Sequence, residues 1–367
     1  MSGRTALVTA AVLVLAVAGV AALSGPSPDE APRLAEQVID AGAPGVLVHV
    51  RDRGETRTIV LGVAHDEPRR LVRSGDRFRI GSVTKTFVAT VVLQLVAEGR
   101  IELEDTADEW LPGLVPNGEE ITVRQLLAHT SGLFDYVDDE RVFAPYAQNP
   151  RHAWSPRALV ELAVAHPSPL RPGERYAYSS TNYLLLELIV EKASGASLER
   201  ELDERIIEPL GLEGTSFEPG VVPGAHIHGH RPPSHHGIVT GWPRDTSGEA
   251  ASWTWGAAAI VSTADDLRRF FHALLRGRLL APAQREAMET LVPAGSLRYG
   301  LGLAVFPTPC GDAWGHTGNA QGTITVAWNT RDASRQVIVV VNTYPLTGEL
   351  EDAVRRLQLS AFCGKVD

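Results

Sequence analysis

The pattern of hydrophobic and polar positions predicts strands at both ends of the chain and helices between them. Residues 45–63 hold two β-rich runs around Arg53-Gly54, which is typical of a hairpin, and residues 77–81 form a third short extended piece. Apolar residues then recur at helical spacing in six segments: 83–99, 123–129, 156–165, 181–194, 198–207 and 264–276. Strand-like runs return over 298–306, 313–318, 321–329 and 335–343. A last helix is predicted over 347–361.

This order of elements predicts an α/β (α+β) fold with two domains. Residues 30–100 and 251–367 would form one α/β domain from both ends of the chain. Residues 101–250, where helical segments alternate with loops rich in proline and glycine, would form an inserted and mostly helical domain. The length of 367 residues agrees with two domains.

The first 25 residues have the pattern of a secretory signal. Arg4 precedes an apolar run over 6–23, and small residues such as Ala18 and Ala22 could serve a signal peptidase. The run is also near the length that spans a bilayer, so an uncleaved membrane anchor is the alternative. We therefore expect a secreted or extracytoplasmic protein, associated with the cell envelope if the segment is not cleaved.

Composition restricts the classes of partner and cofactor. The chain is 44% hydrophobic and 21% charged, as a globular protein is, and a net charge of -10 without a basic run disfavours a nucleic-acid partner. The isolation of Cys310 and Cys363 argues against a zinc site. In an oxidising compartment the pair would bond, and two unrelated buried thiols are the alternative.

Five histidines occur in one short segment, which makes a metal site worth weighing. They are His226, His228, His230, His235 and His236. Histidine is a common metal ligand, but no acidic residue or cysteine lies within the segment, and proline and glycine are frequent there. We therefore predict a solvated loop, no bound metal and no cofactor.

The first motif with chemical meaning is Gly81-Ser82-Val83-Thr84-Lys85, at a junction from strand to helix. A serine and a lysine three positions apart on a helix lie on one face. A hydroxyl nucleophile needs an adjacent base, and lysine can act as one if burial lowers its pKa. Only 3 of the 34 basic residues are lysines, and arginine could not deprotonate here.

Two later segments carry further polar side chains that could line a cleft. Tyr178-Ser179-Ser180 opens a predicted helix, and a phenol beside a lysine could act as a general base. Residues 314–319 (Trp-Gly-His-Thr-Gly-Asn) lie on a strand, where a substrate backbone could pair and an N–H group could hold an oxyanion. Taken singly, each motif could equally be an ordinary helix start or strand end.

Together, in the order Ser-x-x-Lys, Tyr-x-x, His-x-Gly, the motifs resemble those of the serine β-lactamase-related family. The chain is most similar to its class C β-lactamase and soluble D-alanyl-D-alanine carboxypeptidase branch, over about residues 35–365. Residues 126–133 (Leu-Leu-Ala-His-Thr-Ser-Gly-Leu) match a further family segment. The resemblance implies a β-lactamase/transpeptidase-like fold, with an antiparallel sheet flanked by helices.

The resemblance also implies a reaction through an acyl-serine intermediate. Ser82 would attack a carbonyl, and Lys85 with Tyr178 would take and return the proton, with Tyr178 as base when water releases the acyl group. Which of the two is the first base stays open. The substrate would lie against a second set of residues: Ser180, Trp253, His316, Thr317, Gly318 and Asn319. The N–H groups of Ser82 and Asn319 would hold the oxyanion, and Cys310 and Cys363 would form a disulfide.

Two departures from the family pattern leave the substrate open. Ser180 stands where the family often has asparagine, and its shorter side chain cannot reach a substrate amide in the same way. The Gly-Leu-rich strand is followed by Ala304, where the carboxypeptidases have an arginine that binds a terminal carboxylate. The chain is thus expected to be a monomeric, exported serine hydrolase of D-alanyl peptides, peptidoglycan peptides or β-lactams. An esterase and a slow penicillin-binding sensor are the alternatives, and an inactive scaffold is a third.

Overall fold

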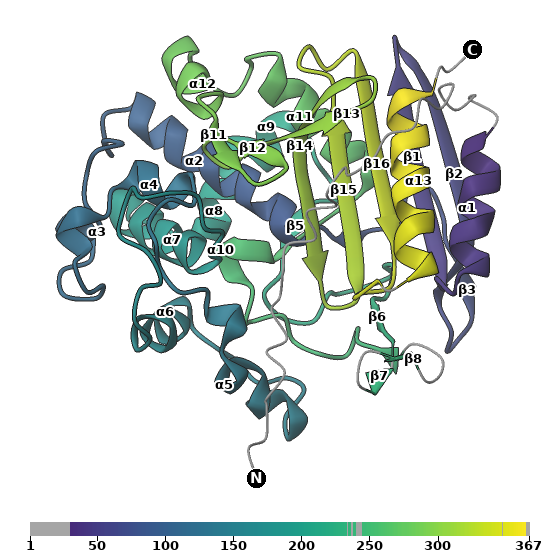
Figure 1. Cartoon of the computed structure of the whole chain (residues 1–367), viewed down its shortest axis with the longest axis horizontal. Coiled ribbons are helices and arrows are strands. Elements are labelled where there is room, and N and C mark those ends of the chain that lie inside the picture. The colour runs from purple at the N-terminus through teal and green to yellow at the C-terminus, as the bar shows by residue number, and fades with distance from the viewer. Residues whose placement is uncertain (1–29, 233, 236–237, 240–243, 347, 365–367) are drawn as a thin grey trace.

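The computed structural model describes residues 30–232, 234–235, 238–239, 244–346 and 348–364, and its main feature is a large antiparallel sheet with helices on both faces (Figure 1). Nine strands form this sheet within the described residues. Their spatial order is β11 (Val292–Ala294), β12 (Leu297–Tyr299), β13 (Ala304–Thr308), β14 (Gly311–Ala320), β15 (Thr323–Asn329), β16 (Arg335–Val341), β1 (Gly45–Asp52), β2 (Glu55–His65) and β3 (Arg70–Leu71). The expected mixed fold with an antiparallel sheet is confirmed.

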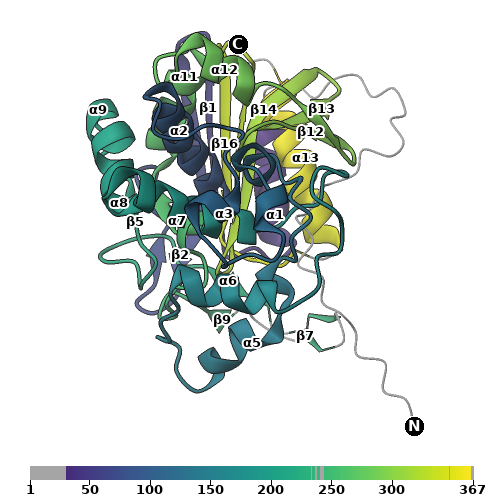
Figure 2. The same ribbon diagram turned by 90° about the vertical axis from the view of Figure 1, so that its left-hand side faces the viewer.

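Strands from the two ends of the chain meet in the middle of the sheet. β1 pairs with β16 from Val46 opposite Val341 to Asp52 opposite Arg335. Alternate side chains of these strands point to opposite faces, as the period of two in a strand requires. Val48 and Val339 face the helices α1 (Glu30–Asp40) and α13 (Glu349–Cys363), which lie side by side on one face (Figures 1 and 2).

The opposite face of the sheet supports the larger core and the helical part of the molecule. Leu47, Ile338 and Val340 point to this side, where α2 (Thr84–Ala97) and α11 (Ala264–Leu275) lie. α2 is buried over almost its whole surface, which explains why its sequence is apolar all round. The remaining helices are α3 (Ala107–Trp110), α4 (Val123–Leu127), α5 (Glu140–Phe143), α6 (Pro156–Val164), α7 (Thr181–Ser194), α8 (Leu198–Leu202), α9 (Glu208–Leu210), α10 (Trp255–Ala258) and α12 (Pro282–Met288).

Short strands complete the described fold outside the large sheet. β4 (Phe78–Arg79), β10 (Ile260–Ser262) and β5 (Ser216–Phe217) form a three-stranded sheet next to α2. Two small pairs follow, β6 (His230–Arg231) with β9 (Arg244–Asp245) and β7 (Ser234–His235) with β8 (Ile238–Val239).

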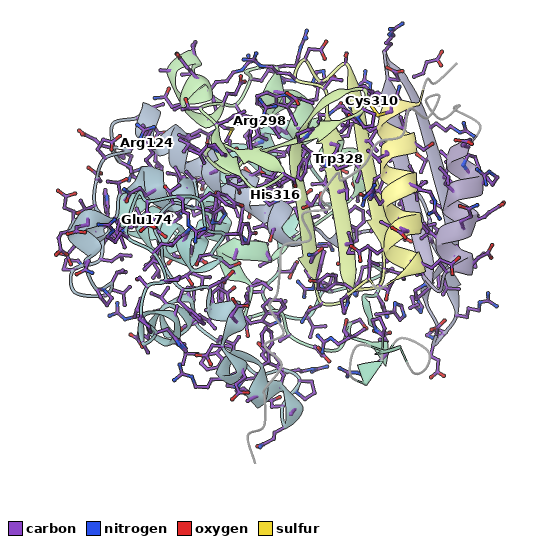
Figure 3. The ribbon with its side chains drawn as sticks, viewed as in Figure 1. Arg124, Glu174, Arg298, Cys310, His316 and Trp328 are labelled. Atoms are coloured by element: carbon purple, nitrogen blue, oxygen red, sulfur yellow. A yellow bond between two sulfur atoms is a disulfide. The ribbon has the colours of Figure 1, made fainter. Side chains whose placement is uncertain are left out.

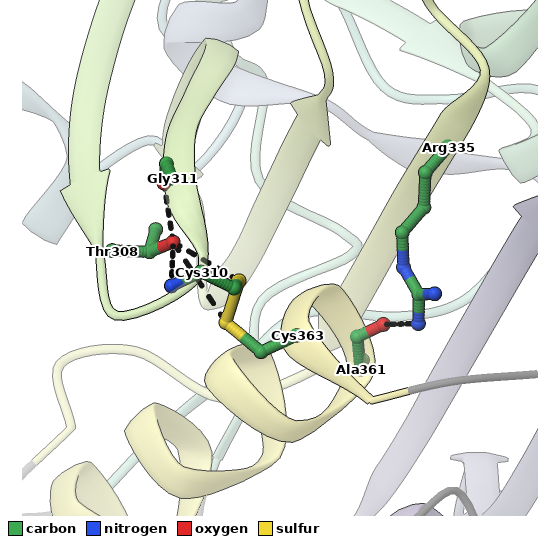
Figure 4. Close-up of a disulfide and its surroundings, with 6 residues drawn as sticks. All are labelled: Thr308, Cys310, Gly311, Arg335, Ala361 and Cys363. Carbon is green, nitrogen blue, oxygen red and sulfur yellow. Dashed lines mark hydrogen bonds between the residues drawn. A yellow bond between two sulfur atoms is a disulfide. The ribbon is translucent and has the colours of Figure 1, made fainter. Parts of the chain in front are cut away.

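A disulfide joins the turn before β14 to the last turn of α13 (Figure 4). The Cα atoms of Cys310 and Cys363 are 5.5 Å apart, and Thr308 lies beside the bond, where its hydroxyl contacts both sulfur atoms. The bond closes a segment of 53 residues that contains the central strands β14, β15 and β16.

Three expectations differ from the structure. The run 298–306 is two short strands, because a sharp turn at Gly302 brings its backbone against α2, where a methyl group would lie 2.3 Å from Ala89 Cβ. The helix expected over 198–207 changes into a π-helical turn at Asp203–Ile207. The solvated histidine loop is wrong for His226 and His230, which are both buried.

The expected signal or anchor over residues 1–25 lies outside the described residues. Within the part of the chain that the structure describes, no helix is long and apolar enough to span a bilayer.

Candidate active site

Ser82 lies in a tight 3-10 turn, Gly81–Val83, which leads directly into α2. Gly81 has a φ of 56°, in the left-handed region that favours glycine. A methyl group at this position would also lie 2.5 Å from the Asn319 nitrogen, so only glycine lets the turn approach β14 so closely. The turn therefore fixes Ser82 at the N-terminal end of a buried helix, against strand β14.

The Ser82 hydroxyl is the meeting point of two side chains that the sequence had singled out. Lys85 Nζ lies 3.1 Å from Ser82 Oγ, one turn along the helix, and the Tyr178 hydroxyl lies 2.8 Å from the same oxygen. Lys85 is fully buried, and its Nζ also donates to the carbonyl of Ala257 at 2.9 Å. The structure thus brings together Ser82, Lys85 and Tyr178, although Tyr178 is 96 positions away in sequence.

Burial sets the charge state of this cluster. Desolvation lowers the pKa of Lys85 from 10.5 to about 7, although the nearby carboxylate of Asp135 acts in the opposite direction. Burial also raises the pKa of Tyr178 well above its ordinary value. A neutral Lys85 amine is therefore accessible near pH 7, while the Tyr178 phenol keeps its proton.

His129 packs against the ring of Tyr178. Its ring centroid lies 4.2 Å from that of Tyr178, and its Nδ1 accepts hydrogen bonds from the Ser179 backbone N–H at 3.2 Å and from the Asn182 amide at 3.1 Å. Burial holds the pKa of His129 well below its ordinary value, so the ring is neutral. The match at residues 126–133 included His129, but its contact with Tyr178 could not be read from the sequence.

Asp135 is a second residue that sequence reasoning missed. Burial raises the pKa of its carboxyl group to about 6, and backbone N–H groups of Ser180 and Val137 donate to it. Its carboxylate acts on Lys85 and raises the pKa of that amine, against the effect of burial. Its contact with Val137 is an ordinary cap at the start of a 3-10 turn, and its contact with Ser180, about 45 positions away, could not be read from the sequence.

His316 lies on β14, at the border between the sheet and the helical part of the molecule (Figure 3). The Tyr299 hydroxyl lies 2.9 Å from His316 Nε2, and His316 Nδ1 contacts the Thr317 carbonyl. Because only an N–H can donate to a carbonyl, Nδ1 carries the proton and Nε2 accepts from Tyr299. Burial lowers the pKa of His316 to about 3, so this residue is neutral at physiological pH.

Backbone atoms of β14 press against the Ser82 turn. A methyl group at Gly318 would lie 1.9 Å from the Ile80 carbonyl oxygen and 2.8 Å from the Ser82 nitrogen. β13 pairs with β14 only as far as Gly315, so in the described part of the chain residues 316–320 have a strand on one side only. This open edge beside Ser82 is where an extended substrate could pair.

The other expected substrate-binding residues are more dispersed. Thr317 and Asn319 lie in register with residues that face α13, and they line a hollow of about 70 Å³ on that side of the sheet. Ser180 lies at the start of α7. Trp253 packs edge-on against Phe143, with ring centroids 5.2 Å apart, four positions before the carbonyl that holds Lys85.

No cluster of three or more histidine, cysteine, aspartate or glutamate side chains suited to a metal ion occurs among the described residues. The side chains that meet at Ser82 are a serine hydroxyl, an amine of lowered pKa and a phenol.

Comparisons with known proteins agree with this geometry. The Beta-lactamase family model matches residues 31–361. The crystal structure of a D-stereospecific amidohydrolase from Streptomyces sp. is 32% identical, with a TM-score of 0.83, and the match covers 93% of this chain and 100% of that chain. Esterase EstB of Burkholderia gladioli is 29% identical over 341 residues, which are 80% of this chain and 86% of that protein.

A penicillin-binding protein of Bacillus subtilis (strain 168) is 26% identical over 315 residues, which are 80% of this chain. The chain spans only 66% of the length of that protein and 54% of the length of another relative from the same organism. The family match, in contrast, covers nearly all of the chain. The chain therefore belongs to the Beta-lactamase family, and the prediction that it is a serine hydrolase is confirmed.

Proposed function

We propose that this protein is an exported hydrolase that forms an acyl-Ser82 intermediate on D-amino-acid derivatives, with amides, peptides and esters as the substrate class. The observation that carries this proposal is the convergence of Lys85 Nζ and the Tyr178 hydroxyl on Ser82 Oγ, at 3.1 and 2.8 Å. A hydroxyl with a neutral amine within hydrogen-bond reach is an activated nucleophile.

Lys85 is the group that takes the serine proton in this proposal. Its lone pair is available when the amine is neutral, and a pKa of about 7 makes that form common at physiological pH. Tyr178 is a poor base by comparison, because burial disfavours its phenolate. Once Lys85 carries the serine proton, its ammonium, 5.0 Å from the centre of the Tyr178 ring, favours loss of the Tyr178 proton, which passes to the leaving nitrogen or oxygen.

The acylated carbonyl then needs donors for its oxyanion and a water for its release. The backbone N–H groups of Ser82 and Asn319 lie in segments that are packed tightly together, which favours a preorganised pair of donors. Lys85 and Tyr178 would return to their starting protonation states when water attacks the ester.

The residues expected beside the substrate favour amides and esters whose leaving group is uncharged over peptides that end in a free carboxylate. Burial lowers the pKa of His316 to about 3, so this residue is neutral and supplies no cation. By the resemblance to the carboxypeptidases, Ala304 stands where those enzymes have an arginine that binds a terminal carboxylate. The 32% identical D-stereospecific amidohydrolase supports D-aminoacyl amides as substrates, and the similarity to esterase EstB supports esters as a second class.

A substrate panel tests this proposal. We expect purified protein to hydrolyse D-phenylalanine amide and p-nitrophenyl acetate, to act at least ten times more slowly on L-phenylalanine amide, and to show no activity as the Ser82→Ala variant. Intact-mass analysis with a penicillin would detect an adduct at Ser82. A persistent adduct without turnover of any amide or ester would instead identify a penicillin-binding sensor, and neither adduct nor activity would refute the acyl-serine mechanism.

Export requires a separate test, because it depends on the first 25 residues. Edman sequencing of the mature protein from its native cells should begin near residue 26 if the segment is cleaved. A full-length N-terminus in the membrane fraction would identify an anchor, and a full-length N-terminus in the cytoplasm would refute export.

A further inference from the structure

Glu187 is a buried carboxylic acid that the proposed mechanism does not use. It lies on α7, is 1% exposed, and its Oε2 accepts a hydrogen bond from the backbone N–H of Gly256 at 2.8 Å. Burial raises the pKa of Glu187 to about 8. An acidic side chain loses favourable hydration when it is buried, and the hydrogen bond from Gly256 offsets part of this cost.

The contact with Gly256 ties Glu187 to the short helix α10. A methyl group at Gly256 would lie 3.0 Å from the Tyr183 carbonyl oxygen and 3.1 Å from Glu187 Oε2, so α7 and α10 are in tight contact there. α10 has only four residues, Trp255–Ala258, too few to be stable without support from the surrounding protein. Its N-cap residue, Thr254, makes no side-chain cap hydrogen bond to it, which leaves the glutamate as the side-chain acceptor for Gly256 N–H.

The start of α10 is also strained. Trp255 has a φ of 35°, in the left-handed region that costs a residue other than glycine about 1 to 3 kcal/mol. The Trp255 indole donates to the Trp154 carbonyl at 2.8 Å, so the strained residue is held on one side by its own side chain. The hydrogen bond from Gly256 to Glu187 holds the following peptide on the other side.

The residue after Gly256 is in direct contact with the catalytic lysine. The carbonyl of Ala257 accepts from Lys85 Nζ at 2.9 Å, and this contact and the one to Ser82 orient the amine. We propose that Glu187 is a positioning residue: by holding the Gly256 peptide, it fixes the Ala257 carbonyl that aims Lys85 at Ser82. This inference rests on the proposed function, since it presumes that Lys85 acts on Ser82.

Two substitutions separate the hydrogen bond from the charge. Glu187→Gln keeps an oxygen acceptor for Gly256 N–H, whereas Glu187→Leu keeps a similar volume without an acceptor. We expect the Gln variant to keep kcat for p-nitrophenyl acetate within about threefold, and the Leu variant to lose about tenfold or more in kcat with little change in KM. Glu191→Gln, on the same helix but bonded to the Leu198 backbone, is the matched control.

A pH profile distinguishes positioning from a general loss of stability. A carbonyl acceptor favours the ammonium form of Lys85, so its displacement in the Leu variant should move the acid limb of kcat/KM to lower pH. If the Leu variant does not fold, Glu187→Asp retracts the carboxylate by one methylene and should give a smaller loss and shift in the same direction. A folded Leu variant with the wild-type kcat and acid limb, or a Gln variant as impaired as Leu, would overturn the inference.

The wild-type protein serves as the reference that keeps the two proposals apart. If it neither hydrolyses the ester nor acylates Ser82, then the proposed function fails. If it is active and the Glu187 variants behave like Glu191→Gln, then only the positioning role fails.

Discussion

Protonation of Lys85 should control the acid side of the pH–rate profile. The fall of its pKa from 10.5 to about 7 corresponds to about 5 kcal/mol against the ammonium form, at about 1.36 kcal/mol per pKa unit. The amine is then neutral in about half of the molecules at pH 7 and in about 1% of them at pH 5. Because only the neutral amine can take the Ser82 proton, kcat/KM should fall about 50-fold between these pH values.

An ester without ionisable groups is the right substrate for this measurement. The amino group of a D-aminoacyl amide would titrate in the same range, whereas p-nitrophenyl acetate would not. We would measure kcat/KM from pH 4.5 to 9 at constant ionic strength, for the wild type and for Asp135→Asn. The Asp135 carboxylate favours the ammonium form, so its removal should move the acid limb to lower pH.

Two results would refute this reasoning. A wild-type limb centred at or below pH 5 would mean that the titrating group is not a buried lysine of lowered pKa. Loss of the limb in Asp135→Asn would mean that the carboxyl group, and not the amine, is what titrates. Lys192→Gln, which changes an exposed lysine, is the control and should leave the profile unchanged.

Three further outcomes follow from the packing. Gly318→Ala should lower kcat by about 10- to 100-fold, because the added methyl group would displace β14 from the Ser82 N–H. Ester kinetics on a variant with unchanged melting temperature measure this loss, and a wild-type kcat would contradict the close approach of β14 to the Ser82 turn. Replacing both Cys310 and Cys363 by serine should lower the free energy of unfolding by about 4 kcal/mol, because the bond closes a 53-residue segment; urea denaturation measures it, and a change below about 1 kcal/mol would contradict this estimate. Burial lowers the pKa of His226 to about 4, so between about pH 4 and 6.5 the unfolded chain binds more protons than the folded protein, and the free energy of unfolding should fall as the pH falls through that window. In urea denaturation, His226→Gln should make the decrease in this free energy between pH 7 and 5 smaller by about 1 to 2 kcal/mol. A decrease as large as in the wild type would exclude His226 as its cause.

The spacing of residues along the chain predicted those contacts of the site that join residues close in sequence. Ser82 lies in the 3-10 turn that leads into α2, and Lys85 lies three positions later in the first turn of α2, so their contact could be inferred from the spacing alone. Tyr178 required the order of the motifs and the family resemblance, because its contact with Ser82 crosses 96 positions. Asp135 and Glu187 could not be found in this way. Each makes a buried contact with a backbone segment distant in sequence, and no pattern in the residues around it indicates that contact.

The fold was predictable to a similar depth. Periodicity located the longer helices α2, α6, α7, α11 and α13 within two residues of their observed ends, and alternation located the central strands. It missed α1 and several helices of three to seven residues. It did not separate β12 from β13, because the break at Gly302 is imposed by the close approach of α2 and not by the sequence of the strands. It also placed the histidines at 226 and 230 in solvent, since polarity alone does not show that the main sheet and its connections enclose them.

The pairing of β1 with β16 has a consequence for how the molecule is made. The ion pair between Asp52 and Arg335 joins positions that are 283 residues apart, and it lies at the end of the ladder that joins the two parts of the sheet. During synthesis the β1–β2 hairpin must therefore wait, with an open edge of Val and Leu residues, until almost the whole chain has emerged. Such late closure slows folding and lengthens the time during which the edge can pair with another chain.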